Sequence, residues 1–496
     1  MSGEKKFILL LISTHLVITL PFAYFLNVWA DEASTLTTTE NGVAATFADF
    51  YNEKQAPLYF LLMGLWREIN GSIFFARLFS ILCSALAIKL FFDLAKKLYS
   101  EKASFFITAV FALHPFLIWA SLEIRVYSLI VLLSIALLNL FYEGFLNRRE
   151  EEIHRFQVFY ILTAIVALYT NYYFGFLLVG NFCALLALNR WRAARIYFWQ
   201  MLVVGIALLP LAWLINLQFA GRAGVFQAEK SLTEGARIFW HHFLTFVLPT
   251  EIYPAEDASY ISIFRVWFAR FAILAAIVTF IGKREKLNEK TLTFGIIVFV
   301  INLFLFTVYF AISPQIVAIR HASVLFVPTL IFVGLILAKI MPPRSPAILA
   351  ILLTVFFSYS IFALYPNLAK RGDWARVGEY IEKNEKPNQP ILVFTTYDAL
   401  VLPYHYRGMN VILPDEKFFD WAAEDAEGSP NSLKKEIDFF ISEIPPEVQE
   451  IWLATHEICQ IKESCQPLEN FIDANYTIVE MKDFYKEKLF LLRKKP

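Results

Sequence analysis

Charged residues are scarce in this sequence, and the charges of the two signs cancel. Asp, Glu, Lys and Arg make up 18% of the 496 residues, with 44 basic and 44 acidic side chains. Soluble domains carry about 25% charged residues, so the composition excludes an ordinary soluble protein. A net charge of zero also provides no positive field that would attract nucleic acid. Hydrophobic residues make up 58% of the chain, including 50 Phe and 11 Trp, and predict a polytopic α-helical membrane protein.

Cysteine is also rare, with four in the chain. Cys83 and Cys183 fall in apolar runs and are expected to be small buried residues. Cys459 and Cys465 lie in the polar C-terminal region and could form a disulfide if that region is outside the cytoplasm. No Cys and His spacing resembles a zinc site. The sequence leaves open whether a divalent metal ion, Mg or Mn, is bound.

Apolar runs long enough to cross a bilayer, about twenty residues each, recur through the first three quarters of the chain. The predicted spans, about eleven by this length rule, are 7–28, 74–95, 103–121, 126–146, 156–171, 174–189, 197–216, 261–281, 291–312, 322–340 and 346–365. The first run is too long for the apolar part of a signal peptide, and no cleavage site closes it, so we expect it to be retained.

The connectors between these spans alternate between basic segments and segments with few Lys or Arg. Lys96 with Lys97, and Arg148 with Arg149, are examples of the basic kind. Because basic connectors face the cytoplasm, the alternation predicts a cytoplasmic N-terminus and an extracytoplasmic C-terminus in the cell (inner) membrane. The outer loops would then be 29–73, 121–126, 217–260 and 313–321.

Two local patterns predict departures from simple spans. Residues 57–66 are amphipathic but too short to cross the bilayer, so we expect a helix at the membrane interface. His114 precedes Pro115 inside a predicted span, which predicts a helix kink more than a catalytic histidine.

From residue 367 the composition becomes that of a soluble domain. We predict a helix that starts near Asp373, as a candidate N-cap, and runs to Asn384. The predicted strands are 391–394, 410–413, 450–454 and 476–480, with a further helix at 432–443. The sequence therefore predicts a transmembrane domain over 1–366 and a soluble extracytoplasmic α/β domain over 367–496.

Two adjacent carboxylates, Asp31 and Glu32, directly follow the first apolar run. Charges near the ends of membrane helices are ordinary, so the pair taken alone is better explained as a marker of the helix end. A carboxylate is, however, what a transfer reaction onto a hydroxyl needs, because it can accept the hydroxyl proton. Asp31 and Glu32 are therefore candidate catalytic residues.

Further charged side chains are predicted on the same side of the membrane. Glu123, Arg125 and Tyr127 lie in the tight second outer loop, Arg320 precedes a late span, and Lys54 lies in the first outer loop. Singly, Glu123 with Arg125 could be an interfacial ion pair, and Arg320 could extend to the headgroups. Arginine and lysine also hold the charge of a departing phosphate, so together these residues predict a site for sugar-phosphate chemistry.

The order of several short motifs resembles a known family. Asp31-Glu32 ends a membrane helix, a Pro-Leu-Tyr stretch leads to ARLFSILCSALAI, and then come SLEIRVYSLI, RHASVLFVP and DWARVGEYI. This arrangement is similar to the GT-C membrane glycosyltransferases, specifically the glycosyltransferase family 39-like group related to protein O-mannosyltransferases and lipid A aminoarabinose transferases. The resemblance covers most of the chain and is strongest over 29–130 and 371–381. Where many relatives have His or a second Pro, this chain has Gln55-Ala56.

The resemblance implies a donor sugar linked to polyprenyl phosphate, lying among the membrane lipids, and transfer on the outer face with inversion. The acceptor hydroxyl would belong to a glycolipid, a protein or a cell-envelope polymer. Asp31 matches the general base, with Glu32 beside it, and Glu123 matches a contact to acceptor or metal. The implied donor-phosphate residues are Lys54, Arg125, Tyr127 and Arg320.

Two other classes of protein remain as alternatives. A transporter or flippase of lipid-linked sugars would carry ionisable residues near the bilayer midplane, on broken helices, whereas the charges here lie at the outer ends of the predicted spans. A membrane-anchored assembly or sensor protein would leave Asp31 and Arg320 without a purpose.

Overall fold

The computed structural model describes residues 3–48, 55–147, 153–220, 231–247, 289–312, 319–340, 355, 357–361, 364–394, 399–413, 441–442, 444–456 and 466–496. The chain divides into two compact units. A helical unit holds Met1–Tyr24 and most of the chain up to Leu364, and a C-terminal unit combines Phe25–Thr37 with Tyr365–Pro496. The domain division predicted at residue 366 stays a prediction. That prediction placed residues 25–37 in the transmembrane domain, whereas the contacts group Phe25–Thr37 with the C-terminal unit.

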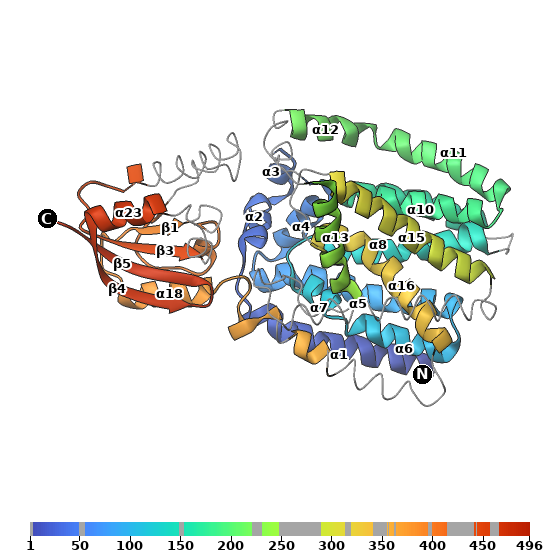
Figure 1. Ribbon diagram of the computed structural model, residues 1–496, viewed down its shortest axis with the longest axis horizontal. Helices are drawn as coiled ribbons and strands as arrows, with labels where there is room; N and C mark the ends of the chain where they lie inside the picture. The colour runs from blue at the N-terminus through green and yellow to red at the C-terminus, as the bar shows by residue number, and fades with distance from the viewer. Residues whose placement is uncertain are drawn as a thin grey trace. The chain divides into compact units, whose positions relative to one another are not determined.

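The helical unit is a bundle of apolar helices (Figure 1). Its helices are α1 (Gly3–Phe25), α3 (Gly42–Ala48), α4 (Leu58–Ile69), α5 (Ile73–Leu98), α6 (Glu101–Ala112), α7 (Pro115–Leu122), α8 (Tyr127–Phe141) continued by a π-helix (Tyr142–Leu146), α9 (Ile153–Thr170), α10 (Phe174–Ala187), α11 (Trp191–Ala207), α12 (Leu209–Ala220), α13 (Leu232–Val247), α15 (Glu289–Ile312), the 3₁₀ helix Ile319–Ala322 and α16 (Ser323–Ile340). Helix α8 packs against α5, α9 and α16, and α15 packs against α10, α13 and α16.

Several of these helices are long and apolar enough to cross a membrane. Among the described residues, five helices pass by length and composition, or up to seven if each of two bent helix pairs counts as one span. This confirms the predicted class of polytopic helical membrane protein. The predicted span 261–281 and most of 346–365 lie outside the described residues, so the total of about eleven stays a prediction.

The predicted kink at His114 and Pro115 is confirmed. Helix α6 ends at Ala112 and α7 begins at Pro115, and the two axes are bent by 46°. His114 caps α7, because its Nδ1 accepts a hydrogen bond from the main-chain N–H of Phe116 at 3.2 Å. The amphipathic stretch 57–66 forms most of α4, the short helix that the pattern predicts.

The C-terminal unit is built on a mixed five-stranded sheet. Its elements are α2 (Ala30–Thr38, of which Thr38 belongs to the helical unit), the 3₁₀ helix Pro366–Leu368, α18 (Trp374–Asn384), β1 (Ile391–Phe394), the 3₁₀ helix Leu402–Tyr404, β2 (Ile412–Leu413), β3 (Glu450–His456), α23 (Gln466–Asn475), β4 (Tyr476–Phe484) and β5 (Glu487–Lys494). The strand order is β2-β1-β3-β5-β4. Strand β1 pairs parallel with β2 and β3, whereas β5 pairs antiparallel with β3 and β4.

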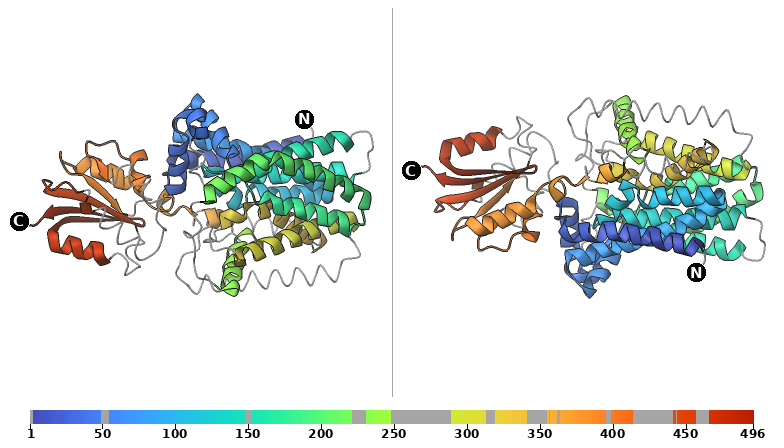
Figure 2. Two further views of the ribbon diagram at one scale, coloured as in Figure 1. Left: turned by 90° about the horizontal axis from the view of Figure 1, so that it is seen from above. Right: turned by 90° about the horizontal axis from the view of Figure 1, so that it is seen from below.

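Helices α18 and α23 cover opposite faces of this sheet (Figures 1 and 2). On the α23 face, Phe394 and Leu453 belong to a buried core cluster against which Phe471 packs. On the α18 face, the ring of Tyr380 meets the edge of the Trp452 ring, with 6.4 Å between centroids. The register places Ile391 opposite Trp452, so the two parallel strands contribute alternate side chains to the same two layers.

The structure corrects three details of the C-terminal prediction. Strand β5 and helix α23 were not predicted, although β5 lies between β3 and β4. Asp373 occupies the predicted N-cap position of α18, but its side chain makes no cap hydrogen bond and instead pairs with Arg376 at 2.6 Å.

Residues Cys459 and Cys465 and most of the predicted helix 432–443 lie outside the described residues.

Candidate functional site

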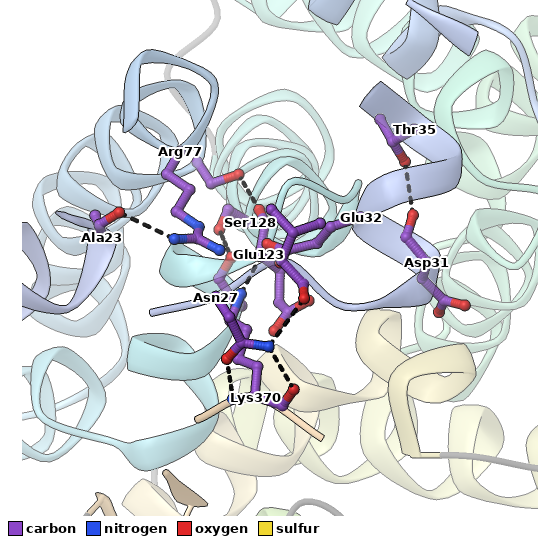
Figure 3. Close-up of polar contacts among 12 residues, drawn as sticks. Ala23, Asn27, Asp31, Glu32, Thr35, Arg77, Glu123, Ser128 and Lys370 are labelled. Carbon is purple, nitrogen blue, oxygen red and sulfur yellow. Dashed lines mark hydrogen bonds and ion pairs between the residues drawn. The ribbon is translucent and has the colours of Figure 1, made fainter. Parts of the chain in front are cut away.

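Asp31 and Glu32 lie in the first turn of helix α2, and their side chains point in different directions. The helix starts directly after Trp29, whose main-chain carbonyl accepts a hydrogen bond from the N–H of Ala33 at 2.9 Å. Because consecutive helical residues are about 100° apart, two adjacent carboxylates cannot share one face. Figure 3 shows Glu32 directed toward Lys370 and Asp31 on another side of the helix. Asp31 is 8% exposed and Glu32 is fully buried.

Glu32 is held in a buried ion pair. Its Oε1 lies 2.7 Å from Nζ of Lys370, and the two side chains are 0% and 2% exposed. Lys370 is separated from Glu32 by 338 residues and precedes α18. An ammonium group at this distance favours the charged form of the carboxylate, so this geometry argues against Glu32 as the general base.

The chain just before α2 is tied to the same segment. The Asn27 side-chain amide donates to the carbonyl oxygens of Lys370, at 3.1 Å, and Gly372, at 2.9 Å, and its Oδ1 accepts from the Lys370 N–H at 2.6 Å. The main-chain N–H of Val28 donates to Nε2 of His405 at 2.9 Å. The entry to α2 is therefore fixed by polar contacts to residues that follow position 369.

Glu123, Arg125 and Tyr127 belong to the helical unit, in the connection between α7 and α8 and the first turn of α8. All three are buried, with exposures of 1%, 7% and 5%. The Tyr127 ring stacks on the Trp119 ring, with 4.8 Å between centroids. The main-chain carbonyl of Glu123 accepts a hydrogen bond from Ser80 Oγ at 2.7 Å. The three residues are near one another because they are close in sequence, and their grouping in one site stays a prediction.

A chain of buried polar groups underlies this connection, and the sequence analysis did not find it. His15 Nδ1 donates to the Ala112 carbonyl at 2.9 Å, and its Nε2 lies 2.9 Å from Ser121 Oγ. Ser121 Oγ is in turn 2.8 Å from Ser84 Oγ, which donates to Ser128 at 3.2 Å. A histidine inside the apolar run 7–28 was the available signal, because ionisable residues within spans are rare and tend to be functional or structural.

Arg320 and Lys54 are the two predicted phosphate-binding residues that remain. Arg320 lies in the 3₁₀ helix before α16, is partly exposed, and accepts a hydrogen bond from Ser323 Oγ at its main-chain carbonyl at 2.5 Å. Lys54 lies outside the described residues. Among the residues that are described, no group of three or more His, Cys, Asp or Glu side chains could hold a metal ion, and we assign no residue to a metal.

Comparison with solved structures identifies the fold. ArnT from Cupriavidus metallidurans in the apo state is similar over 99% of this chain and 98% of its own, with a TM-score of 0.60 and 13% identity. ArnT from the same organism bound to undecaprenyl phosphate is similar over 98% of this chain and 97% of its own, with a TM-score of 0.58 and 13% identity. The chain therefore has the fold of the GT-C membrane glycosyltransferases, which confirms the family resemblance of the sequence at the level of the fold. No family model and no curated protein sequence matches the chain.

Proposed function

We propose that the chain is an inverting glycosyltransferase that moves a monosaccharide from a polyprenyl-phosphate-linked donor to an acceptor hydroxyl. The observation that carries this proposal is the full-length likeness to ArnT, one structure of which holds undecaprenyl phosphate. The buried Asp31 at the start of α2 supports it, because a carboxylate of this kind can take the proton of an attacking hydroxyl.

In the proposed reaction, Asp31 accepts the proton as the acceptor oxygen attacks the anomeric carbon. The bond from that carbon to the phosphate oxygen breaks, and its electron pair leaves with the polyprenyl phosphate. Attack opposite the departing phosphate inverts the anomeric centre. Positioning of the two substrates and stabilisation of charge on the phosphate would supply most of the rate.

The proposed roles of the other residues follow from their charge. Arg125, Tyr127, Arg320 and Lys54 would hold the donor phosphate, since arginine and lysine form charge-assisted hydrogen bonds to phosphate oxygens. Glu123 would contact the acceptor. Glu32 is proposed to position Asp31 and not to contact the substrate, because its carboxylate is bound to Lys370.

The proposed location follows from the basic connectors. With these in the cytoplasm, the reaction would take place on the outer face of the cell membrane, and the C-terminal unit would lie outside. The acceptor would then be a hydroxyl of a glycolipid, a protein or a cell-envelope polymer that is exposed on that face.

Mass spectrometry of lipid-linked sugars and glycoconjugates tests the proposal in cells. The cells compared would lack the protein, or carry the wild type, Asp31→Asn or Asp93→Asn. Asp93 is a matched control because it forms an exposed ion pair with Lys89 on α5. We expect one polyprenyl-phosphate sugar to accumulate and one glycoconjugate to disappear without the protein and with Asp31→Asn only. Unchanged pools would overturn the proposal.

A second measurement separates transfer from transport. Purified protein would be mixed with the donor that accumulates and with a membrane extract of cells without the protein, which supplies the unmodified acceptor, and free polyprenyl phosphate would be measured. A transferase releases polyprenyl phosphate and changes the anomeric configuration of the sugar, whereas a flippase leaves the donor intact.

A further inference from the structure

The residues just before α18 hold the helix that carries Asp31. We propose that Lys370 is a positioning residue for the transfer reaction: through its buried ion pair with Glu32 it fixes the orientation of α2 and thereby of the Asp31 carboxylate. This inference rests on the proposed function. It adds to that function a role for a lysine that lies 338 residues from its partner in sequence.

The first support is the number of independent contacts at this place. Lys370 contributes its side chain to Glu32, its carbonyl oxygen to the Asn27 amide, and its N–H to the Asn27 oxygen. One residue therefore contacts both the first turn of α2 and the chain that enters it. Asn27 is 3% exposed and Lys370 is 3% exposed, so water does not compete for these contacts.

Neighbouring residues hold the same helix at two further points. The Arg371 guanidinium lies over the Trp29 ring, 3.9 Å from its centroid, a cation–π contact. At the far end of the helix, the hydroxyl of Thr37 lies 3.1 Å from that of Tyr404. Helix α2 is thus held near both of its ends by residues that follow position 369.

The second support is the backbone of the segment that carries Lys370. Asn367, Leu368 and Arg371 have φ values of 56°, 59° and 52°, and Gly372 has a φ of 154°. Residues with a side chain rarely adopt positive φ values, and the strain at Asn367, Leu368 and Arg371 persists only where the surrounding structure imposes it. Any other residue would be strained at the φ of residue 372, and the buried Glu487 side chain would have to move to make room for its Cβ. The fold therefore presents Lys370 to Glu32 at the expense of a strained backbone.

Single and double substitutions of Glu32 and Lys370 are expected to have opposite effects, because the ion pair is buried. Removing one member leaves an uncompensated buried charge, whereas replacing both members by neutral side chains is often tolerated. Lys370→Met and Glu32→Gln each create such a charge at the first turn of α2. The double variant Glu32→Gln/Lys370→Met removes both charges and keeps the approximate volume of the two side chains.

The test measures donor turnover by the full-length protein in detergent or nanodiscs, in the presence of the unmodified acceptor from cells without the protein. We expect each single variant to lower kcat by at least about tenfold, with KM for the donor within about twofold of wild type, because the donor-binding groups are unchanged. The double variant should recover kcat to within about threefold of wild type. As a matched control, Glu450→Gln/Arg493→Met removes an ion pair of similar length, 2.8 Å, between β3 and β5 and should leave both constants unchanged.

Hydrogen exchange of the main-chain amides of residues 30–37 provides a readout that does not depend on activity. Exchange should be faster in both single variants than in wild type and should return toward the wild-type rate in the double variant and in Lys370→Arg. Full kcat in both single variants, or exchange in α2 that no variant changes, would overturn the inference. If the wild type releases no polyprenyl phosphate while the exchange pattern is as expected, the proposed function fails and the positioning of α2 by Lys370 stands.

Discussion

The guanidinium of Arg77 donates a hydrogen bond to the main-chain carbonyl of Ala23, with 3.0 Å between nitrogen and oxygen. Arg77 lies in α5 and is fully buried, and Ala23 lies in the last turn of α1. Carbonyl groups in the last turn of a helix have no partner within that helix, and a positive charge near this end is favourable. Arg77 therefore closes the C-terminal end of α1.

Replacement of Arg77 by Met should destabilise the protein in detergent. The Ala23 carbonyl would lose a charged donor, and the cost of losing a hydrogen bond to a charged group is about 1.5–3 kcal/mol. Thermal unfolding of purified protein measures the effect, with Lys89→Met, at an exposed position of the same helix, as the control. Equal melting temperatures for the Arg77 and Lys89 variants would contradict the assigned role.

The hydroxyl of Ser121 is expected to stabilise the connection that carries Glu123. In Ser121→Ala, His15 Nε2 loses the hydroxyl group that lies 2.9 Å away, and a buried polar group without its partner costs about 1–3 kcal/mol. The matched control is Ser134→Ala on α8, because the buried Ser134 hydroxyl has no hydrogen-bond partner within the described part of the chain. Melting curves should separate the two variants; a larger loss for Ser134→Ala would be inconsistent with the network.

Gly372→Ala should disrupt the C-terminal unit. A φ of 154° is strained for any residue with a Cβ, which costs about 1–3 kcal/mol, and the added methyl group would in addition collide with Glu487. We expect a lower yield of folded protein and a lower melting temperature. Gly71→Ala is the control, since no described atom lies within 4 Å of a Cβ added there. Similar stability of the two variants would rule out the steric constraint.

The Glu450 carboxyl should make stability depend on pH. The hydrogen bond from Arg493 holds its pKa below the usual value of 4.5. A carboxyl whose pKa is lower in the folded state stabilises the fold above the unfolded pKa, and this contribution is lost as the pH falls through the folded value. Arg493 is 58% exposed, so the contribution should stay below about 1 kcal/mol.

The melting temperatures of wild type and Glu450→Gln test this dependence. The wild type should melt higher at about pH 7, and the difference should shrink as the pH falls well below 4.5. A difference that is constant over this range would show that the ion pair does not contribute.

The architecture was predictable because its signals are local. The apolar runs that predict α1, α5 and α15 need only a window of about twenty residues, and Pro115 predicts the break between α6 and α7 on its own. Strand β5 was not predicted, because its sequence, Glu487–Lys494, mixes charged and apolar residues. It is defined by its pairing with β3 and β4, which are separate segments of the sequence.

The site was predictable only in part, because its contacts are between residues far apart in sequence. Asp31, Glu123 and Arg125 were found as charges at the ends of apolar runs. Lys370 was missed, since nothing near it in sequence indicates a partner 338 residues away. Arg77 could have been found, because it is a charge inside the predicted span 74–95, where such residues need a buried partner.

Release of polyprenyl phosphate by purified protein tests the central proposal most directly. Wild type, Asp31→Asn and Asp93→Asn, matched for the amount of folded protein, would be given the polyprenyl-phosphate sugar that accumulates in cells without the protein, together with the unmodified acceptor from those cells. Loss of a general base typically costs about 10²–10⁴-fold in rate, so Asp31→Asn should release polyprenyl phosphate at least about 100-fold more slowly, with Asp93→Asn unchanged. Equal rates for wild type and Asp31→Asn would contradict the account.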